Sequence, residues 1–120
     1  MENVSLSQKA NPMSNEKKWL FNSPKFKTSG VDHCVPEKVQ LAIWSYIESR
    51  RHQQVPLDYL QVFTLRSEKK ETVIMQIIEC SQEVPPYQFT ISFPTNAPID
   101  DKIFVIDDVD HQTMLLAREY

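Results

Sequence analysis

LDYLQVFTLRSEKKETVIMQIIEC, residues 57–80, is the most regular stretch of the chain. From Leu60 to Leu65 the residues alternate with a period of two, and both alternating sets hold apolar side chains, so a central strand is predicted. The charged run SEKKE at 67–71 predicts a hairpin turn. From Thr72 to Cys80 the apolar residues again fall on both faces, which predicts a second strand.

Three further strands are predicted downstream. Pro85 and Pro86 interrupt the ladder, because proline has no N–H to donate. Residues Tyr87 to Phe93 then alternate apolar with polar side chains, the pattern of a strand that is solvated on one face. The expected strands are 87–93, 103–106 and 113–117.

One helix is predicted upstream, from Pro36 to about His52. Proline suits the first helical position, where its missing N–H would have no partner. The helix ends before Pro56. Its apolar residues repeat at helical spacing and predict one buried stripe, made by Val39, Ile43, Tyr46 and Ile47. A short strand is expected at 25–30, with Gly30 supplying a turn.

Together these elements predict an α+β fold, in which one main helix packs on a strongly bent antiparallel sheet or partial barrel of about five to six strands. Residues 1–23 have no sustained periodicity and are predicted to form a flexible arm, so that residues 24–120 are a single α+β domain. Trp19, Leu20 and Phe21 interrupt the polarity of the arm. Two interpretations stay open for them: packing against the core, or anchoring a partner.

The charge of the chain is strongly divided. Residues 1–70 carry 11 Lys or Arg and 7 Asp or Glu, a net charge of +4, whereas residues 71–120 carry 2 and 9, a net charge of −7. Such a field orients approaching partners. The acidic residues between the last strands are the candidate partner-binding residues: Asp100, Asp101, Asp107, Asp108 and Asp110.

Several classes of protein are excluded by composition. Gly30 is the single glycine, so the glycine-rich loops that bind nucleotide phosphates are absent. No apolar run approaches the ~20 residues of a membrane-spanning helix. The N-terminus has no apolar core of a secretory signal. Cys34 and Cys80 are therefore expected to be reduced thiols, and the chain is expected to be cytoplasmic.

Two metal sites are conceivable from residue types. Asp107, Asp108, Asp110 and His111 offer oxygen and imidazole ligands within five residues, but a solvated hairpin turn explains the same residues. His33, Cys34 and Cys80, with a fourth group, have the ligand chemistry of a zinc site, although no Cys-x-x-Cys spacing supports it.

The chain also has candidate residues for catalysis and for nucleic-acid binding. Cys34 and His33 have the residue types of a thiolate–imidazole pair, yet neighbours in an extended segment point to opposite faces, so His52 or His111 would have to take part. A small basic and aromatic surface is conceivable from Trp19, Lys25, Phe26, Lys27, Arg50 and Arg51. The net charge of −3 argues against phosphate binding as the main activity.

A resemblance lies in DYLQVFTL at 58–65, QEVPPY at 82–87, DKIFVIDD at 101–108 and TMLLAREY at 113–120, together with LAIWSYIE at 41–48. In combination they resemble a family of small proteins of Gram-positive bacteria and their phages and plasmids, catalogued as a domain of unknown function (number nine hundred and sixty). The resemblance covers roughly Lys25 to Tyr120 and implies a compact cytoplasmic domain without an assigned activity. The long arm and the His33–Cys34 pair depart from the pattern.

The charge pattern and the resemblance lead to one hypothesis: a non-enzymatic interaction protein of a phage or other mobile element, which docks on a larger host or phage protein. A host defence nuclease with a basic channel, for instance an RNA-guided one, fits this pattern, and the chain would then inhibit it. Two alternatives stay open, a small metal-dependent or Cys/His hydrolase and a structural accessory of the mobile element. Neither direct nucleic-acid contact nor membrane contact is expected, and no cofactor other than a possible zinc ion.

Overall fold

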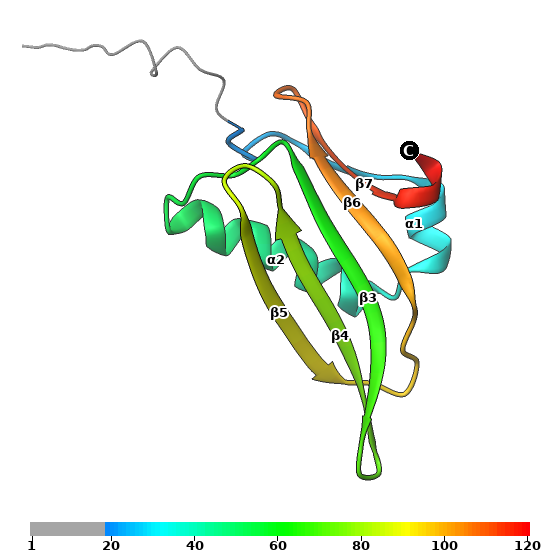
Figure 1. Ribbon diagram of the computed structural model, residues 1–120. Coiled ribbons are helices and arrows are strands. Elements are labelled where there is room, and N and C mark those ends of the chain that lie inside the picture. The colour runs from blue at the N-terminus through cyan, green and yellow to red at the C-terminus, as the bar shows by residue number, and fades with distance from the viewer. Residues whose placement is uncertain (1–18) are drawn as a thin grey trace, which may run out of the picture.

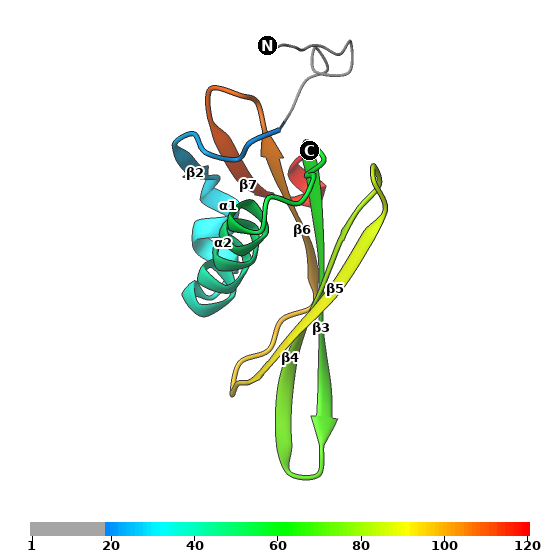
Figure 2. The same cartoon turned by 90° about the vertical axis from the view of Figure 1, so that its left-hand side faces the viewer.

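A computed structural model describes residues 19–120, which form an open, twisted six-stranded sheet with its two α-helices on one side (Figure 1, Figure 2). The helices are α1 (Ser29–Cys34), α2 (Glu37–His52) and the 3-10 helix η2 (Ala117–Glu119). The strands are β2 (Lys25–Lys27), β3 (Leu60–Lys70), β4 (Val73–Gln82), β5 (Tyr87–Pro94), β6 (Asp101–Asp107) and β7 (Gln112–Leu116).

The strand order is β2-β7-β6-β3-β4-β5. β3, β4 and β5 form an antiparallel meander, and β6 and β7 form a separate hairpin. The two units join where β6 pairs antiparallel with β3, and β2 runs parallel to β7. The long β5–β6 connection therefore carries the chain past β4 to the other side of β3, and β2 and β5 are left as the two edges.

The expected fold class, one main helix on a strongly bent antiparallel sheet or partial barrel in an α+β fold, is wrong. The described residues are 43% strand and only 25% helix, so the sheet dominates. The sheet is mixed, because β2 is parallel to its neighbour, and it stays open, because β2 and β5 do not pair. Closure into a barrel requires the two edges to meet, and here the helices cover one face instead.

The predicted helix is confirmed, and it supplies one side of the core. It begins after Pro36, and its stripe of Val39, Ile43, Tyr46 and Ile47 is buried. These side chains belong to one apolar cluster with Phe63, Ile78, Cys80, Ile103, Val105 and Met114 of the sheet. Burying each large aliphatic side chain contributes about 1.5–3 kcal/mol.

Two local predictions need correction. The run SEKKE is not a turn as a whole, because β3 continues to Lys70 and pairs it with Val73 across a two-residue connection. Gly30 is not in a turn but inside α1, where a Cβ would stand 2.3 Å from a carboxylate oxygen of Glu119. That carboxylate accepts hydrogen bonds from Thr28 Oγ1 at 2.7 Å and from the Leu116 N–H at 2.8 Å.

Five buried glutamines form hydrogen bonds with backbone groups of the segments that connect the strands and helices. The periodicity of the sequence does not predict that these glutamines are buried. Gln76 is completely buried and bonds both the N–H and the C=O of Ile99 in the β5–β6 connection. Gln112 is equally buried and donates to the Ser23 C=O at 2.7 Å. The other three are Gln40, Gln61 and Gln82. Buried carbonyls without partners are costly, so these amides allow irregular segments to lie against the sheet.

The N-terminal segment that the structure describes packs on the fold. Phe21 is fully buried in the core cluster, and its N–H donates to Asp107 Oδ2 at 3.0 Å. Phe21 therefore packs against the core, which was one of the two interpretations left open for Trp19, Leu20 and Phe21. The predicted arm extends over residues 1–23, and residues 1–18 lie outside the described part. Among residues 19–120, no helix has the length and apolarity needed to cross a membrane.

Candidate functional site

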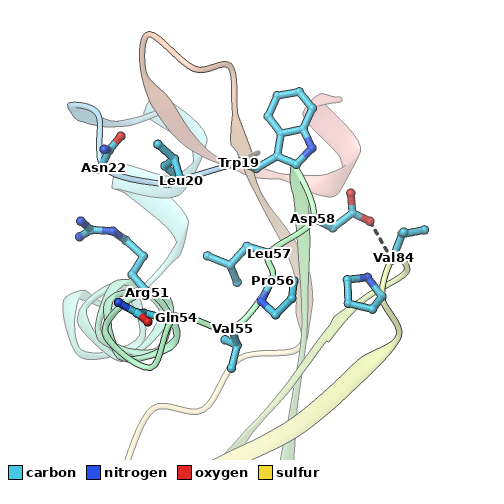
Figure 3. A pocket seen from close by; sticks show the side chains of 11 residues that line it. Trp19, Leu20, Asn22, Arg51, Gln54, Val55, Pro56, Leu57, Asp58 and Val84 are labelled. Atoms are coloured by element: carbon cyan, nitrogen blue, oxygen red, sulfur yellow. Dashed lines mark hydrogen bonds between the residues drawn. The ribbon is translucent and has the colours of Figure 1, made fainter. Parts of the chain in front are cut away.

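A groove with a volume of about 620 Å³ lies at the end of the sheet where β4 turns into β5 (Figure 3). Four segments build it: the N-terminal residues 19–22, the last turn of α2, the connection from α2 to β3, and the β4–β5 turn. The side chains that line it are Trp19, Leu20, Asn22, Arg51, Gln54, Val55, Pro56, Leu57, Asp58, Val84 and Pro85.

Two polar side chains hold the walls of this groove in place. Gln82 is buried and donates to the Pro56 C=O at 3.2 Å and to the Pro85 C=O at 2.8 Å, which joins the two walls. Its Oε1 accepts from Gln61 Nε2 at 2.8 Å. Asp58 adds a second link, because its Oδ2 accepts from the Val84 N–H at 3.1 Å, the dashed line in Figure 3. The groove is therefore preorganised by hydrogen bonds.

Large apolar side chains surround the groove and remain exposed. Leu20 is 55% exposed, Tyr59 39% and Val84 70%. Trp19 contacts Tyr59 with ring centroids 5.7 Å apart, so aromatic surface continues from the groove to the start of β3. Single exposed apolar residues are ordinary, but a group of them around one hollow is typical of an interaction site.

The hairpin between β6 and β7 lies beside the groove. Asp107 at the base of this hairpin forms hydrogen bonds with Phe21 and Tyr59, which are next to residues that line the groove. Asp107 accepts from the Phe21 N–H, and its own N–H donates to the Tyr59 C=O at 3.0 Å. At 3% exposure Asp107 is buried, so the expectation that its carboxylate stays solvated and available to a partner does not hold. Phe21 and Val109 supply the two N–H groups that satisfy it.

The tip of this hairpin presents Asp108, Val109 and Asp110, all exposed. Val109 has a φ of 76°, a left-handed backbone conformation that a β-branched residue rarely adopts. The bond from its N–H to Asp107 Oδ1 at 2.9 Å helps hold the turn in this conformation. Asp108 lies 3.3 Å from His111 Nε2. A strained turn thus projects an apolar side chain, 59% exposed, between two carboxylates.

The other predicted acidic pair lies elsewhere. Asp100 and Asp101 stand at the start of β6, and the hairpin follows its end, so the two acidic groups are separated by the strand, roughly 20 Å. Asp100 is exposed, whereas Asp101 forms an ion pair with Arg118 at 2.9 Å. The hydrogen bonds that the Arg118 guanidinium donates to the Asp101 carboxylate raise the pKa of Arg118. The partner-binding role of these residues stays a prediction.

His33, Cys34 and Cys80 are not brought together. His33 and Cys34 are exposed on α1, where His33 Nδ1 contacts the Ser29 C=O at 2.7 Å. Cys80 is 1% exposed within β4, and burial raises the pKa of its thiol to about 12. No group of three His, Cys, Asp or Glu side chains able to hold a metal ion occurs among residues 19–120. Neither the candidate zinc ligands His33, Cys34 and Cys80 nor the acidic residues near His111 form such a group.

The basic and aromatic residues also do not form one surface. Lys25 and Lys27 of β2 pair with Glu48 and Asp32, at 2.9 and 3.0 Å. Arg50 is buried, with its guanidinium carbon 3.4 Å from the centre of the Tyr87 ring. Arg51 and Trp19 line the groove.

The sequence predictions missed the groove itself. Leu57 and Val84, which line it, and Gln82, which joins its walls, all fall outside the predicted helix and strands. The available signal was the segment QEVPPY, in which a valine and two prolines follow a glutamine and a glutamate. Periodicity alone cannot show that this turn folds back onto the connection after α2.

Comparisons with known proteins give a family without an assigned activity. The model of the family "Staphylococcal protein of unknown function (DUF960)" matches residues 24–119, and the chain belongs to this family. The predicted resemblance is therefore confirmed. No curated protein matches the chain. The crystal structure of a protein of unknown function from Enterococcus faecalis is similar, with a TM-score of 0.63 and 20% identity over 88% of this chain and 98% of that chain. This likeness shows the fold.

Proposed function

We propose that the protein is a non-enzymatic interaction module, which binds a larger protein by accepting an apolar, basic segment of it in the groove. The observation that carries this proposal is the combination of a hydrogen-bonded groove with exposed apolar side chains around it and carboxylates beside it. The apolar contacts are Leu20, Val84 and Val109, which are 55%, 70% and 59% exposed.

The charge around the groove favours a basic partner. Glu83 is exposed in the β4–β5 turn, and Asp108 and Asp110 are exposed at the neighbouring hairpin tip. Arg51, the basic residue that lines the groove, is paired with Glu48. A partner that offers lysine or arginine beside an apolar side chain would therefore meet complementary charge, which raises association rates more than it raises affinity.

Proteins that bind nucleic acid offer surfaces of this kind, because they must neutralise phosphates with Lys and Arg. Within the proposal, the protein belongs to a phage or other mobile element and acts in the cytoplasm of the host. There it occupies the basic channel of a host defence nuclease, for instance an RNA-guided one, and competes with the nucleic acid. The acidic net charge of residues 71–120, −7, supports such competition.

The experiment measures the affinity of the full chain, of three variants and of one control variant for a purified partner candidate of this class. Val84→Ser removes an apolar contact of the groove, and Asp108→Asn with Asp110→Asn removes the tip charges. Val73→Ser is the matched control, because Val73 is 45% exposed but lies at the opposite end of β4. Val84→Ser is expected to weaken binding about tenfold, since a buried Val contributes about 1.5–3 kcal/mol.

The third variant, Val109→Gly, separates binding from folding. Glycine adopts a positive φ without strain, so this change leaves the fold as stable or makes it more stable. It also removes the exposed side chain, so binding falls. Binding that stays equal in all variants, with the same dependence on salt between ~0.1 M and ~1 M, would overturn the proposal.

A further inference from the structure

Arg50 of α2 is a buried cation without an anionic partner, and it lies beside the edge strand β5. Its side chain is 7% exposed, and its guanidinium carbon is 3.4 Å from the centre of the Tyr87 ring at the start of β5. Its Nε is buried without a hydrogen-bond partner, and Arg50 forms no ion pair with any residue in the range 19–120. Burying an arginine is costly unless its charge is paired, and contact with a ring offsets only part of that cost. The Arg50 guanidinium is therefore suited to pair with a carboxylate of another molecule.

A second unpaired cation lies at the other end of β5. Lys38 Nζ is 4.7 Å from the centre of the Phe93 ring, and Lys38 also has no ion pair within the described part of the chain. Between the two cations, Tyr46 stacks on Phe89 with ring centroids 5.7 Å apart. α2 thus follows β5 from Phe93 to Tyr87, and its C-terminal end reaches past the edge of the sheet (Figure 1). The helix side of β5 is therefore an aromatic row with a cation at each end.

The edge of β5 itself is open to a further strand. β5 pairs with β4 on one side, and its other side has no strand partner among the described residues. Its sequence, YQFTISFP, carries no charge, and its eight register pairs with β4 run without a bulge. Edge strands are normally protected by charged side chains, by bulges or by short length. β5 has none of these from Tyr87 to Phe93.

The opposite edge of the sheet is protected. β2 has only three residues, two of which are lysines. Lys25 pairs with Glu48 of α2 at 2.9 Å, and Lys27 pairs with Asp32 of α1 at 3.0 Å. Lys27 also donates to Gln40 Oε1 at 3.2 Å. The cations beside β2 are therefore already paired, in contrast to those beside β5.

The backbone groups that β5 presents outward can be assigned. The Thr95 N–H donates to the Ile74 C=O at 3.0 Å and therefore points toward β4. Backbone groups along a strand alternate in direction, so every second residue counted back from Thr95 also points toward β4. The N–H and C=O groups of Gln88, Thr90 and Ser92 point away from it and are the groups that a further strand would bond.

We propose that β5 binds an extended segment of a partner protein as a further strand, a segment with two apolar side chains between two carboxylates. The backbone of that segment bonds the outward groups of Gln88, Thr90 and Ser92, which gives affinity with little dependence on sequence. Side chains of a strand alternate between the faces of a sheet, so every second side chain of the segment lies on the α2 side. These side chains provide the selectivity.

The α2 side of the edge decides which side chains the segment needs. The inner two lie opposite Phe89, which is 48% exposed, and Ile91, so apolar side chains extend the row. The outer two lie at the ends of β5, next to Arg50 and Lys38, so carboxylates there pair with both cations. A segment with lysines at the same two positions brings like charges together and is rejected.

This edge selects the opposite charge from the groove. The groove is flanked by the exposed carboxylates of Asp108 and Asp110 and is proposed to accept a basic segment. The β5 edge accepts an acidic one, so the two surfaces take different segments and binding at β5 does not depend on the groove.

The test is an NMR titration of the full chain with the peptide Glu-Thr-Val-Thr-Val-Thr-Glu, blocked at both ends, up to about 1 mM. The peptide is expected to bind saturably and to shift the amide resonances of Gln88, Thr90 and Ser92. The amide of Val73, at the far end of β4, is expected not to move. A peptide with lysine in place of both glutamates is expected to bind about tenfold more weakly or less.

Two variants assign the binding to this edge. Arg50→Met keeps the apolar stem over Tyr87 but removes the charge, and it is expected to weaken binding about tenfold. The matched control is Arg66→Met, which removes a cation that pairs with Glu79 elsewhere on the sheet and leaves binding unchanged. Thr90→Pro removes an outward N–H without breaking a bond to β4 and is expected to weaken binding about tenfold as well.

Circular dichroism checks that each variant is folded, and the two peptides test the charge preference on the unmodified chain. Three results would each overturn the proposal: no saturable binding of the acidic peptide, equal binding of the lysine peptide, or binding that Arg50→Met and Thr90→Pro both leave at the wild-type level.

Discussion

Replacing Gln82 by leucine tests whether buried amides hold the groove together. Leucine is close to glutamine in volume, so the change removes hydrogen bonds and leaves little cavity. Gln82 donates to the C=O groups of Pro56 and Pro85, and its Oε1 accepts from Gln61 Nε2 and from the Asp58 N–H at 3.3 Å. Four groups therefore lose a hydrogen bond, although Gln61 Nε2 keeps the one that it donates to the Asp58 C=O at 2.9 Å.

The expected cost follows from where these four groups lie. Pro56 and Pro85 are exposed residues, so water can replace the amide at their carbonyls and little is lost there. Gln61 is completely buried, and the one N–H of its amide that loses its acceptor costs about 1–3 kcal/mol. With a further contribution of about 1 kcal/mol from the Asp58 N–H, Gln82→Leu is expected to lower the free energy of unfolding by about 2–4 kcal/mol.

Urea unfolding with linear extrapolation measures this loss, and an unchanged m value shows that the same surface is exposed on unfolding. Gln88→Leu is the matched control, because Gln88 is exposed on β5, and it is expected to stay within about 0.5 kcal/mol of wild type. The indole N–H resonance of Trp19 should shift only in Gln82→Leu. A loss below about 0.5 kcal/mol, with Trp19 unmoved, would refute the view that this amide organises the groove.

Ile43→Ala should lower the free energy of unfolding by about 2–5 kcal/mol in urea titration, because Ile43 is fully buried on the core-facing side of α2, and a smaller effect would place this stripe outside the core. Phe21→Ala should lower the free energy of unfolding by about 3–5 kcal/mol, because Phe21 is also fully buried. A near-neutral result would show that Phe21 does not contribute to the core. In the native protein a thiol reagent at pH 8 should modify only the exposed Cys34, because burial raises the pKa of the Cys80 thiol to about 12. In urea the reagent should modify Cys80 as well. Rapid modification of both thiols in the native protein would contradict this. Hydrogen bonds from Leu116 and Thr28 lower the pKa of Glu119, so its contribution to stability is present above the unfolded pKa and is lost as pH falls through the folded one. Glu119→Gln should therefore flatten the acid side of the stability profile, and an unchanged profile would count against these bonds.

Much of the local structure was predictable from periodicity. The helix from Pro36 and its buried stripe, and the strands at 60–65, 72–80 and 87–93, agree with α2, β3, β4 and β5. Alternation and helical spacing report which side of a local segment is apolar, and that requires no knowledge of distant residues. The family could be identified for a similar reason, since its motifs are local runs.

The candidate site was predictable only in part. Asp108 and Asp110 are exposed at a hairpin tip, as expected of acidic turn residues, but Asp107 in the same run is buried. Nothing local separates the three carboxylates. The difference arises because the Phe21 N–H, 86 residues away in the chain, needs an acceptor at the base of the hairpin.

The sequence by itself determined the positions and apolar faces of the main helix and strands, the division of charge and the family. Tertiary structure alone decided that β6 pairs with β3, that the sheet stays open at β5, and that Gln82 and Asp58 join two turns into a groove. The physical reason is the range of the interactions. Burial patterns repeat along a segment, whereas strand order and polar satisfaction depend on which distant backbone groups need partners once the core has formed.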